Sequence, residues 1–347
     1  MGPRIAVYPS GHGFGHAVRV AEVVEALLER SPAAVVHAKT VAPPAIFSPS
    51  GRVVLHRGEI DFGLSQPDGL SVDFDDTLAR LARLEEEWDR RVNAEARWLR
   101  EIDAELVLAD IPAIAFDAAA AAGVPSIGLG NFSWDWMYAA YARELPAFAK
   151  HAERAGRSYA LARALIRLPF HADMPRFPRV VDVPMIARRS PVPRGEARRR
   201  LGLPLDRRLV LVGFGGLGFG SLSVERLDRV PGVDYVTTEG RTLEPADYVL
   251  WLRACDAVLT KPGYGMVAAT LVNGVRVLYT GRDSFPEFPI LARALEEHGT
   301  ASFVPLDDLR NGTIGRRLEA LLARPVSETA LAADGAARAA EIVLELV

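Results

Sequence analysis

The chain has 347 residues, of which 49% are hydrophobic and 24% charged, and this length predicts about two domains of ordinary globular composition. Its formal net charge of −3 gives no positive field for nucleic acid or an acidic membrane. The single cysteine, Cys255, excludes an internal disulfide framework and a cysteine metal cluster. No apolar run reaches about 18 residues, and the first one is too short for a signal peptide. We therefore expect a cytoplasmic protein without a transmembrane segment.

The first half alternates short apolar runs with helical patterns. Strands are expected at Ile5–Tyr8, Val35–Ala38, Val53–His56, Leu106–Ala109 and Ser126–Leu129. Helices are expected at Val18–Arg30, Thr77–Ile102 and Ala113–Ala122. In the longest helix, apolar residues recur every three or four positions. This alternation predicts a parallel sheet covered on both faces.

The stretch 176–194 contains four prolines and no helical period, so we interpret it as an interdomain linker with a boundary near residue 185. After it, the alternation restarts. Strands are expected at 209–213, 234–237, 257–259 and 275–279, and helices at 223–229, 244–254, 265–273 and 288–298. We predict an α/β protein with two Rossmann-like, doubly wound domains, 1–175 and 195–347, that face each other across a cleft.

The first glycine-rich loop, Ser10-Gly11-His12-Gly13-Phe14-Gly15-His16, stands between the first strand and the first helix. Glycines let backbone N–H groups approach a ligand, and a helix N-terminus favours negative charge. Because histidine accepts protons near neutral pH, His16 and His12 are candidate catalytic residues. Gly13, Gly15 and Arg19 are candidates for contact with the sugar or acceptor. The alternative is that the imidazoles only bind neighbouring backbone.

Three loops of the second half are candidates for a nucleotide diphosphate. The glycine cluster 213–220 could surround phosphate oxygens with main-chain donors, although glycine also permits tight packing. A second loop, 260–265, joins a strand to a helix through a turn whose N–H groups are available. A third loop, 281–287, carries charges for phosphate and for sugar hydroxyls. The alternative is that the charged residues of these loops only face solvent. The candidates are Gly215, Gly216, Lys261, Gly263, Tyr264, Gly265, Arg282, Asp283 and Glu287.

A tryptophan-rich loop, Gly128 to Trp136, follows the last predicted strand of the first half. Sugar faces stack on aromatic rings while polar groups bind the hydroxyls, so this loop is a candidate carbohydrate platform. The alternative is that its tryptophans belong to the core of a helix that reaches Tyr141. The candidates are Asn131, Ser133, Trp134 and Asp135.

Five segments carry a resemblance to a known family. GHGFGHAVR, NFSWDWMY, DVPMIARR, GFGG and KPGYG…RDSFPE resemble, in this order, the glycosyltransferase-like N-terminal region of plant-type L-arabinokinases, from about residue 4 to about residue 310. The sugar-kinase half of those proteins, with its Gly/Ser-rich ATP loop, has no counterpart in the sequence. Kinase activity is therefore not expected.

More distantly, the chain is similar to peptidoglycan N-acetylglucosaminyltransferases and to UDP-sugar hydrolases of nonulosonate synthesis. This resemblance implies the GT-B fold, a UDP-sugar bound mainly by the C-terminal half, and a histidine of the first glycine loop that matches His16. Those relatives also hold the ribose with a glutamate, at a position where this chain has Ala269. The choice between UDP and another nucleotide therefore stays open.

We expect a metal-independent glycosyltransferase that moves a sugar from a nucleotide sugar, UDP-sugar being the first choice, to an unknown acceptor, with no cofactor. No Asp-x-Asp motif follows an apolar strand, so the sequence gives no sign of a metal-bound diphosphate. The alternatives are a nucleotide-sugar hydrolase or epimerase, and a non-catalytic nucleotide-sugar sensor. A dehydrogenase is disfavoured, because no acidic residue follows the first glycine loop at a ribose-binding spacing. The sugar, the stereochemical outcome and the oligomeric state are left open.

Overall fold

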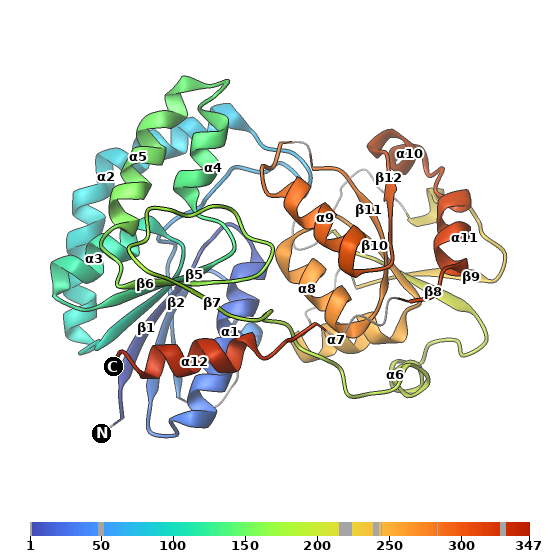
Figure 1. Cartoon of the computed structure of the whole chain (residues 1–347), viewed down its shortest axis with the longest axis horizontal. Coiled ribbons are helices and arrows are strands. Elements are labelled where there is room, and N and C mark those ends of the chain that lie inside the picture. The colour runs from blue at the N-terminus through green and yellow to red at the C-terminus, as the bar shows by residue number, and fades with distance from the viewer. Residues whose placement is uncertain are drawn as a thin grey trace. The chain divides into compact units, whose positions relative to one another are not determined.

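The structure is a computed structural model that describes residues 2–47, 52–214, 224–238, 243, 245–282, 284–326 and 331–347. The chain forms two compact units (Figure 1). Unit 1 consists of Met1–Ser65, Asp73–Ile186 and Asp334–Val347, and unit 2 of Gln66–Val72 and Ala187–Ala333.

Unit 1 contains a parallel sheet with the strand order β3-β2-β1-β4-β5-β6-β7. The strands are β1 (Arg4–Pro9), β2 (Val35–Thr40), β3 (Val53–Arg57), β4 (Leu106–Asp110), β5 (Ser126–Gly130), β6 (Ala164–Arg167) and β7 (Val180–Asp182). Every residue of β4 and β5 is buried, as expected for central strands of a parallel sheet. The edge strand β7 lies inside the stretch 176–194 that the sequence predicts as a linker.

Helices cover both faces of this sheet. They are α1 (Phe14–Arg30), α2 (Phe74–Glu101), α3 (Ala113–Ala122), α4 (Trp134–Tyr141), α5 (Ala149–Tyr159) and α12 (Gly335–Leu344), with the short 3₁₀ turns η1 (Pro44–Ile46) and η2 (Pro146–Phe148). Helix α3 packs against α2 and α5, and α1 packs against α12; the two groups lie on the two sides of the sheet in Figure 1. Asp73 caps the N-terminus of α2, and its side chain accepts a hydrogen bond from the Asp76 N–H at 2.9 Å.

Unit 2 contains a smaller parallel sheet with the order β12-β11-β10-β8-β9. The strands are β8 (Arg208–Val212), β9 (Val233–Thr237), β10 (Ala257–Thr260), β11 (Arg276–Thr280) and β12 (Ala301–Val304). The helices are α6 (Arg194–Leu201), η3 (Val224–Arg226), α7 (Pro245–Ala254), α8 (Tyr264–Asn273), α9 (Phe288–His298), α10 (Leu306–Asn311) and α11 (Gly315–Ala323). Both sheets have a doubly wound, Rossmann-like order.

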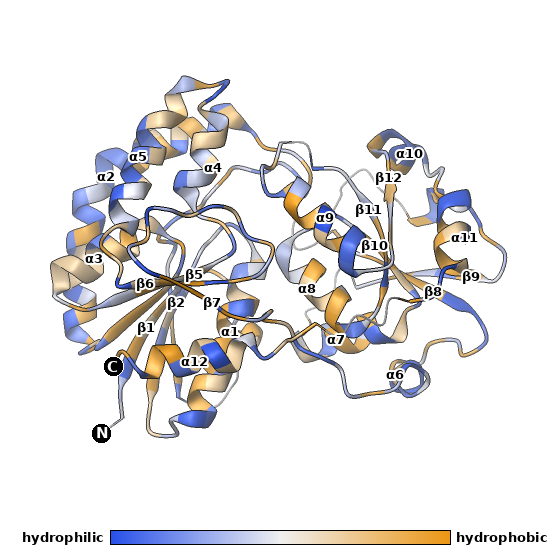
Figure 2. Ribbon diagram, in the orientation of Figure 1, coloured by the Kyte–Doolittle hydropathy of each residue, from blue (hydrophilic) through white to orange (hydrophobic). Residues whose placement is uncertain are grey.

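Two segments depart from the domain bounds expected from the sequence. Helix α12 falls within the predicted second domain, 195–347, but packs on α1 in unit 1, where Ala339, Ala340 and Val343 are buried. Its ribbon is largely white to orange in Figure 2, which agrees with an apolar contact face. Segment 66–72 falls within the predicted first domain, but its Leu70 belongs to the apolar core of unit 2. The free energy of burying these apolar side chains accounts for both departures.

Candidate functional site

The strand order of unit 1 locates a ligand crevice. Sequential strands run outward from β1 in one direction and from β4 in the other, so the point where the order reverses lies between β1 and β4. In doubly wound sheets, ligands bind at the carboxyl ends of the strands at this point. The first glycine-rich loop follows β1, and Asp110 is the last residue of β4. Ser10 N–H donates to the Asp110 carbonyl at 3.2 Å, which joins the two strand ends.

A buried polar cluster lies at this point. Asp110 Oδ1 is 2.8 Å from His16 Nδ1 and accepts a hydrogen bond from Arg19 Nη2 at 2.6 Å, and Asp110 Oδ2 accepts from Arg19 Nε. Arg19 Nη1 also donates to Asn131 Oδ1 at 2.8 Å. His16, Arg19 and Asn131 are buried, and Asp110 has no exposed surface. The structure thus brings together the predicted residues His16, Arg19 and Asn131 around Asp110, which was not among the predicted site residues.

Two side chains of this cluster contact the same ring nitrogen of His16, Nδ1. Burial raises the pKa of Asp110, but the charges of Arg19 and His16 and their hydrogen bonds outweigh it, so the pKa lies below its ordinary value. An ionised carboxylate only accepts hydrogen bonds, so the Asp110 contact favours a proton on His16 Nδ1. Arg19 Nη2 lies 2.9 Å from the same nitrogen and can only donate, so this contact favours the tautomer with the proton on Nε2. With the proton on Nδ1, the lone pair of Nε2 is a proton acceptor.

A second buried carboxylate, Asp61, holds the start of the glycine loop. It accepts hydrogen bonds from Ser10 Oγ at 3.0 Å, from Gly11 N at 3.0 Å and from Trp134 Nε1 at 2.9 Å. Burial raises the pKa of Asp61 to about 6, against the lowering effect of the Gly11 and Ser10 hydrogen bonds. Asp61 therefore links the loop after β1 to the loop after β5.

Trp134 does not provide the exposed carbohydrate platform expected from the sequence. It is 2% exposed, stacks on Tyr138 with ring centroids 5.7 Å apart, and meets Phe132 and His12 edge to face. The physical reason is its indole N–H, whose bond to Asp61 directs the ring inward. The predicted Ser133 and Asp135 are also buried, and Ser133 Oγ donates to Asp135 Oδ1. Burial raises the pKa of Asp135.

The rest of the first glycine-rich loop is open. Gly13 and Gly15 are exposed, and a Cβ at either position would meet no atom within 4 Å. Phe14, between them, is 49% exposed. His12 is half-buried, and its Nδ1 accepts a hydrogen bond from the Leu64 N–H at 3.3 Å. Its ring centroid lies 6.0 Å from that of His16. The loop therefore offers accessible backbone beside both imidazoles.

In unit 2 the strand order reverses between β8 and β10, which locates a second crevice by the same rule. Gly213 follows β8, and its carbonyl accepts a hydrogen bond from Thr260 Oγ1 at 2.7 Å. Lys261 follows Thr260 and leads into α8. The N-cap residue of this helix is Gly263, so no side chain caps its N-terminus. A Cβ at Gly263 or Gly265 would meet no atom within 4 Å, whereas Tyr264 is buried. The predicted residues Gly215, Gly216 and Asp283 lie outside the described residues.

The charged candidates of unit 2 are near one another. Arg282 Nη1 lies 3.6 Å from Glu287 Oε1, Arg282 Nη2 donates to Gln66 Oε1 at 3.2 Å, and the guanidinium lies 3.4 Å from the Phe285 ring centroid. Burial and the charge of Arg282 lower the pKa of Lys261 to about 7, although Glu287 and Asp68 oppose this. Arg282 and Glu287 were expected to bind phosphate and sugar separately; in the structure they lie within ion-pair distance of each other.

Other features carry no catalytic assignment. Among the described residues, no group of three or more His, Cys, Asp or Glu side chains has positions that could hold a metal ion. In the same part of the chain, no helix has the length and apolarity that crossing a membrane requires.

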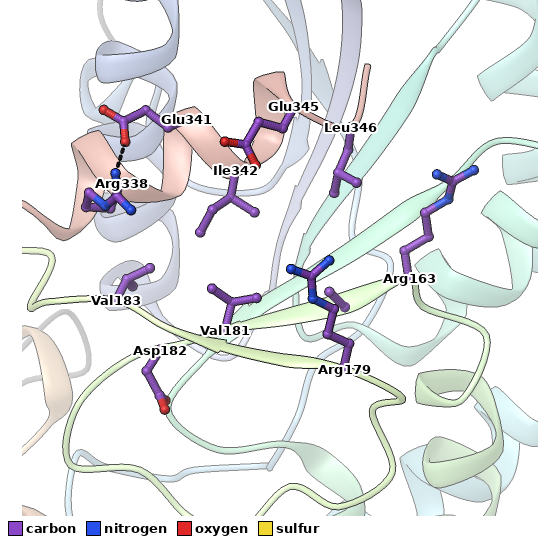
Figure 3. A pocket seen from close by; sticks show the side chains of 11 residues that line it. Arg163, Arg179, Val181, Asp182, Val183, Arg338, Glu341, Ile342, Glu345 and Leu346 are labelled. Atoms are coloured by element: carbon purple, nitrogen blue, oxygen red, sulfur yellow. Dashed lines mark hydrogen bonds and ion pairs between the residues drawn. The ribbon is translucent and has the colours of Figure 1, made fainter.

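A cavity of about 400 Å³ lies between β6, β7 and α12 (Figure 3). Its lining includes Arg163, Arg179 and Glu345 but none of the predicted site residues.

Asp110 and Asp61 are the residues that sequence reasoning missed as site residues. Asp110 directly follows a predicted strand, and the end of a central parallel strand is where doubly wound folds place ligand-binding groups. That signal was available for Asp110. Asp61 lies in a polar loop, and nothing in the local sequence indicates that it contacts Ser10 and Trp134.

Comparison with known proteins agrees with this architecture. The chain is a homologue of L-arabinokinase from Arabidopsis thaliana, with 35% identity over 314 residues; the match covers 84% of this chain and 29% of the relative. The chain thus spans less than a third of the length of that relative. No family model matches it.

Solved glycosyltransferases share the fold at low sequence identity. A glycotransferase of kitacinnamycin is 16% identical, with a TM-score of 0.65 and coverage of 99% of both chains. Arabidopsis thaliana UGT89C1, solved with quercetin, is 16% identical, with a TM-score of 0.61 and coverage of 99% of this chain and 95% of that one. The same enzyme solved with UDP has a TM-score of 0.58 at 17% identity, covering 99% and 94%. The chain has the GT-B fold of glycosyltransferases, and the resemblance to L-arabinokinases is confirmed.

Proposed function

We propose that this protein transfers a sugar from a nucleotide sugar to a hydroxyl group of an acceptor, with His16 as the general base. The observation that carries the proposal is the buried contact of 2.8 Å between His16 Nδ1 and an ionised Asp110. It leaves Nε2 ready to accept a proton, and it offsets the positive charge that His16 gains when it does so. The GT-B fold supports sugar transfer as the reaction class.

In this mechanism His16 Nε2 takes the proton of the acceptor hydroxyl. The acceptor oxygen forms a bond to the anomeric carbon of the donor, and the bond from that carbon to the diphosphate oxygen breaks with its electron pair on the diphosphate. Arg19 keeps Asp110 ionised throughout, because its guanidinium binds both carboxylate oxygens.

Unit 2 would bind the diphosphate of the donor. Support comes from the second crevice, where the uncapped N-terminus of α8 and Lys261 both favour an anion. Accessible backbone at Gly263 and Gly265 would allow close approach of phosphate oxygens. We propose that UDP is the nucleotide, since solved proteins of this fold bind it, and that no metal ion is needed because the cation and the helix dipole offset the charge.

The first experiment measures release of free UDP from a panel of UDP-sugars, with and without added hydroxyl acceptors. The name of the L-arabinokinase relative makes UDP-arabinose and free arabinose part of the panel. UDP release that requires an acceptor would support transfer. Release of free sugar without an acceptor would make the protein a nucleotide-sugar hydrolase. Tight binding without turnover over hours would contradict an enzymatic role and favour a sensor.

The second experiment tests the base. His16→Ala should lower turnover by about 10²-fold or more, and Asp110→Asn should also lower it because an amide can favour the wrong His16 tautomer. Nucleotide-sugar affinity, measured by calorimetry, should change little in His16→Ala. His298→Ala, at the end of α9 in unit 2, is the matched histidine control. Near-normal turnover of His16→Ala would remove this residue from the mechanism.

The third experiment tests metal independence. Turnover and UDP-sugar binding should survive treatment with a chelator, because Lys261 and the α8 N-terminus supply the positive charge that a divalent cation supplies elsewhere. The measurement is the rate before and after chelator treatment, and again after magnesium or manganese is added. A strict requirement for either metal would contradict the proposed phosphate site.

A further inference from the structure

Five arginines gather around one carboxylate at the amino ends of the strands of unit 2. The carboxylate is that of Asp256, which directly precedes β10. The arginines come from α6, from the end of α7 and from the first positions of β8 and β11: Arg194, Arg198, Arg253, Arg208 and Arg276. The second crevice lies at the carboxyl ends of the same strands, so this cluster stands apart from the proposed nucleotide site.

The register of the sheet brings these residues together. Ala257, the first residue of β10, pairs with Arg276 of β11 and with Val210 of β8, two residues after Arg208. Because the strands are parallel, their amino ends lie at one edge of the sheet. Helix α6, which packs on α7, adds Arg194 and a second arginine to this edge.

The two oxygens of Asp256 have different surroundings. Oδ2 accepts hydrogen bonds from Arg198 Nη2 at 2.6 Å and from the Leu209 N–H at 2.8 Å, and both Arg198 and Asp256 are buried. Oδ1 lies 3.3 Å from Arg194 Nη1 and 3.9 Å from Arg208 Nη1. Oδ2 therefore fastens α6 to the sheet, whereas Oδ1 is shared by two arginines at longer distances.

One carboxylate does not offset all of these charges. Burial, followed by the charges of Arg194 and Arg208, lowers the pKa of Arg276, and Asp256 opposes this effect. Burial and neighbouring arginines lower the pKa of Arg194 in the same way. Arg253 and Arg276 donate their hydrogen bonds to backbone carbonyls, which carry no net charge. The cluster therefore holds a surplus of positive charge that a bound anion would offset.

Arg194 and Arg208 are the members of the cluster that a solute can reach. Their side chains are 32% and 53% exposed. Arg194 Nε, by contrast, is buried and has no hydrogen-bond partner among the described residues. Unsatisfied buried donors are rare in folded proteins, and sites that bind an ion or water are one place where they occur.

We propose that this cluster is a binding site for a phosphate group, held by Arg194 and Arg208 on the solvent side of Asp256. Two oxygens of a phosphate match the fork of one guanidinium, and its double negative charge offsets two arginines. The guanidinium groups converge on one carboxylate, so the site suits a small molecule and not an extended polymer. The group is either free phosphate or part of a phosphorylated small molecule. This inference does not depend on the proposed sugar transfer.

The test is calorimetry with inorganic phosphate and with glucose 6-phosphate at constant ionic strength, which keeps general charge screening equal. Every protein carries Lys261→Met, which removes the proposed phosphate contact of the second crevice. We expect saturable binding that Arg194→Gln and Arg208→Gln each weaken by about tenfold, the effect of one charge-assisted hydrogen bond. Tighter binding of glucose 6-phosphate would assign the site to a phosphorylated molecule, and equal or weaker binding to free phosphate. No saturable binding of either probe would overturn the proposal.

Arg199→Gln is the matched control, because this arginine also lies on α6 but is 60% exposed and pairs with Glu196 at 2.9 Å. It should bind phosphate like the Lys261→Met parent. Urea unfolding without phosphate separates binding from a structural role: Arg208→Gln should be at least as stable as the parent, because it removes repulsion between like charges. Equal phosphate affinity of the Arg194→Gln, Arg208→Gln and Arg199→Gln proteins would overturn the proposal. A less stable Arg208→Gln protein would also overturn it, since that arginine would then serve the fold.

Discussion

Asp110 serves two partners at once, and this arrangement governs the chemistry available to His16. Without Arg19, burial would favour a protonated Asp110, which could then donate to His16 and leave Nε2 as the protonated nitrogen. With Arg19 bound to both carboxylate oxygens, Asp110 remains an acceptor. Arg19 is thus a positioning residue in the proposed reaction: it acts through Asp110, and not on the substrate.

Lys261 gives a prediction about pH. Its pKa is lowered to about 7, mainly by burial and then by Arg282. A bound diphosphate favours the charged form, so the pKa of Lys261 rises on binding. Between the free and bound pKa values the complex takes up a proton, and the affinity falls by up to about tenfold for each pH unit above about 7. Below pH 7 the lysine is already charged and the affinity should be flat.

Calorimetry with UDP-glucose between pH 6 and 9, in two buffers of different ionisation enthalpy, measures both affinity and proton uptake. UDP-glucose is the right probe because its diphosphate has no group that titrates near neutral pH. Lys261→Met should bind more weakly and lose the proton uptake. Equal affinity across this pH range for the wild type would show that Lys261 does not face the diphosphate.

At the scale of elements, the loop between β3 and α2 supports the site and depends on one glycine. Gly63→Ala places a Cβ 2.4 Å from the Trp134 ring and forces an alanine into φ +70°. The variant should lose about 1–3 kcal/mol of unfolding free energy, the range for strained backbone or overpacking. Turnover should fall with it, because Trp134 and His12 must move. Urea unfolding and steady-state rates give the two measurements.

Gly13→Ala is the matched control, since its backbone is extended, at φ 168°, and its Cβ would meet open space. It should unfold like the wild type. If Gly63→Ala is as stable as Gly13→Ala and as active as the wild type, the loop 61–64 does not hold the site in the way its contacts indicate.

The same scale shows what could be predicted from the sequence. Elements with a strong local pattern, such as α2 and α3, were predicted close to their observed bounds. The edge strand β7 was not, because it has three residues in a proline-rich stretch and is stabilised by pairing with β6. His16 and Arg19 are three residues apart in the chain, so their proximity could be predicted, whereas the Asp61–Trp134 hydrogen bond joins residues 73 positions apart and follows only from the packed structure.

At the scale of the whole molecule, the chain passes between its two units several times. Segment 66–72 leaves unit 1, places Leu70 in the core of unit 2 and Gln66 against Arg282, and returns. A simple cut near residue 190 therefore does not yield a complete unit 2. It removes a core side chain and a partner of Arg282, and it retains α12, which packs on unit 1.

Two pieces of unit 2 test this organisation, and they also test the proposal that unit 2 binds the donor and unit 1 the acceptor. The first is 187–333 alone, and the second carries 66–72 joined to it through a flexible Gly/Ser linker. The joined piece should be more stable by about 2–5 kcal/mol, the range for loss of a buried leucine side chain, and it should bind UDP-glucose by itself, though more weakly than the full chain. Lys261→Met in the joined piece should weaken that binding.

Urea unfolding of both pieces and calorimetry on the joined piece provide the measurements, with Leu70→Ala in the joined piece as control. Equal stability of the two pieces would contradict the assignment of 66–72 to unit 2. If the joined piece folds but binds no nucleotide, while a piece of unit 1 does, the donor and acceptor assignments are reversed. In that case His16 would lie beside the diphosphate, where an imidazolium could stabilise the leaving group, and Lys261 would be left to bind an anionic acceptor.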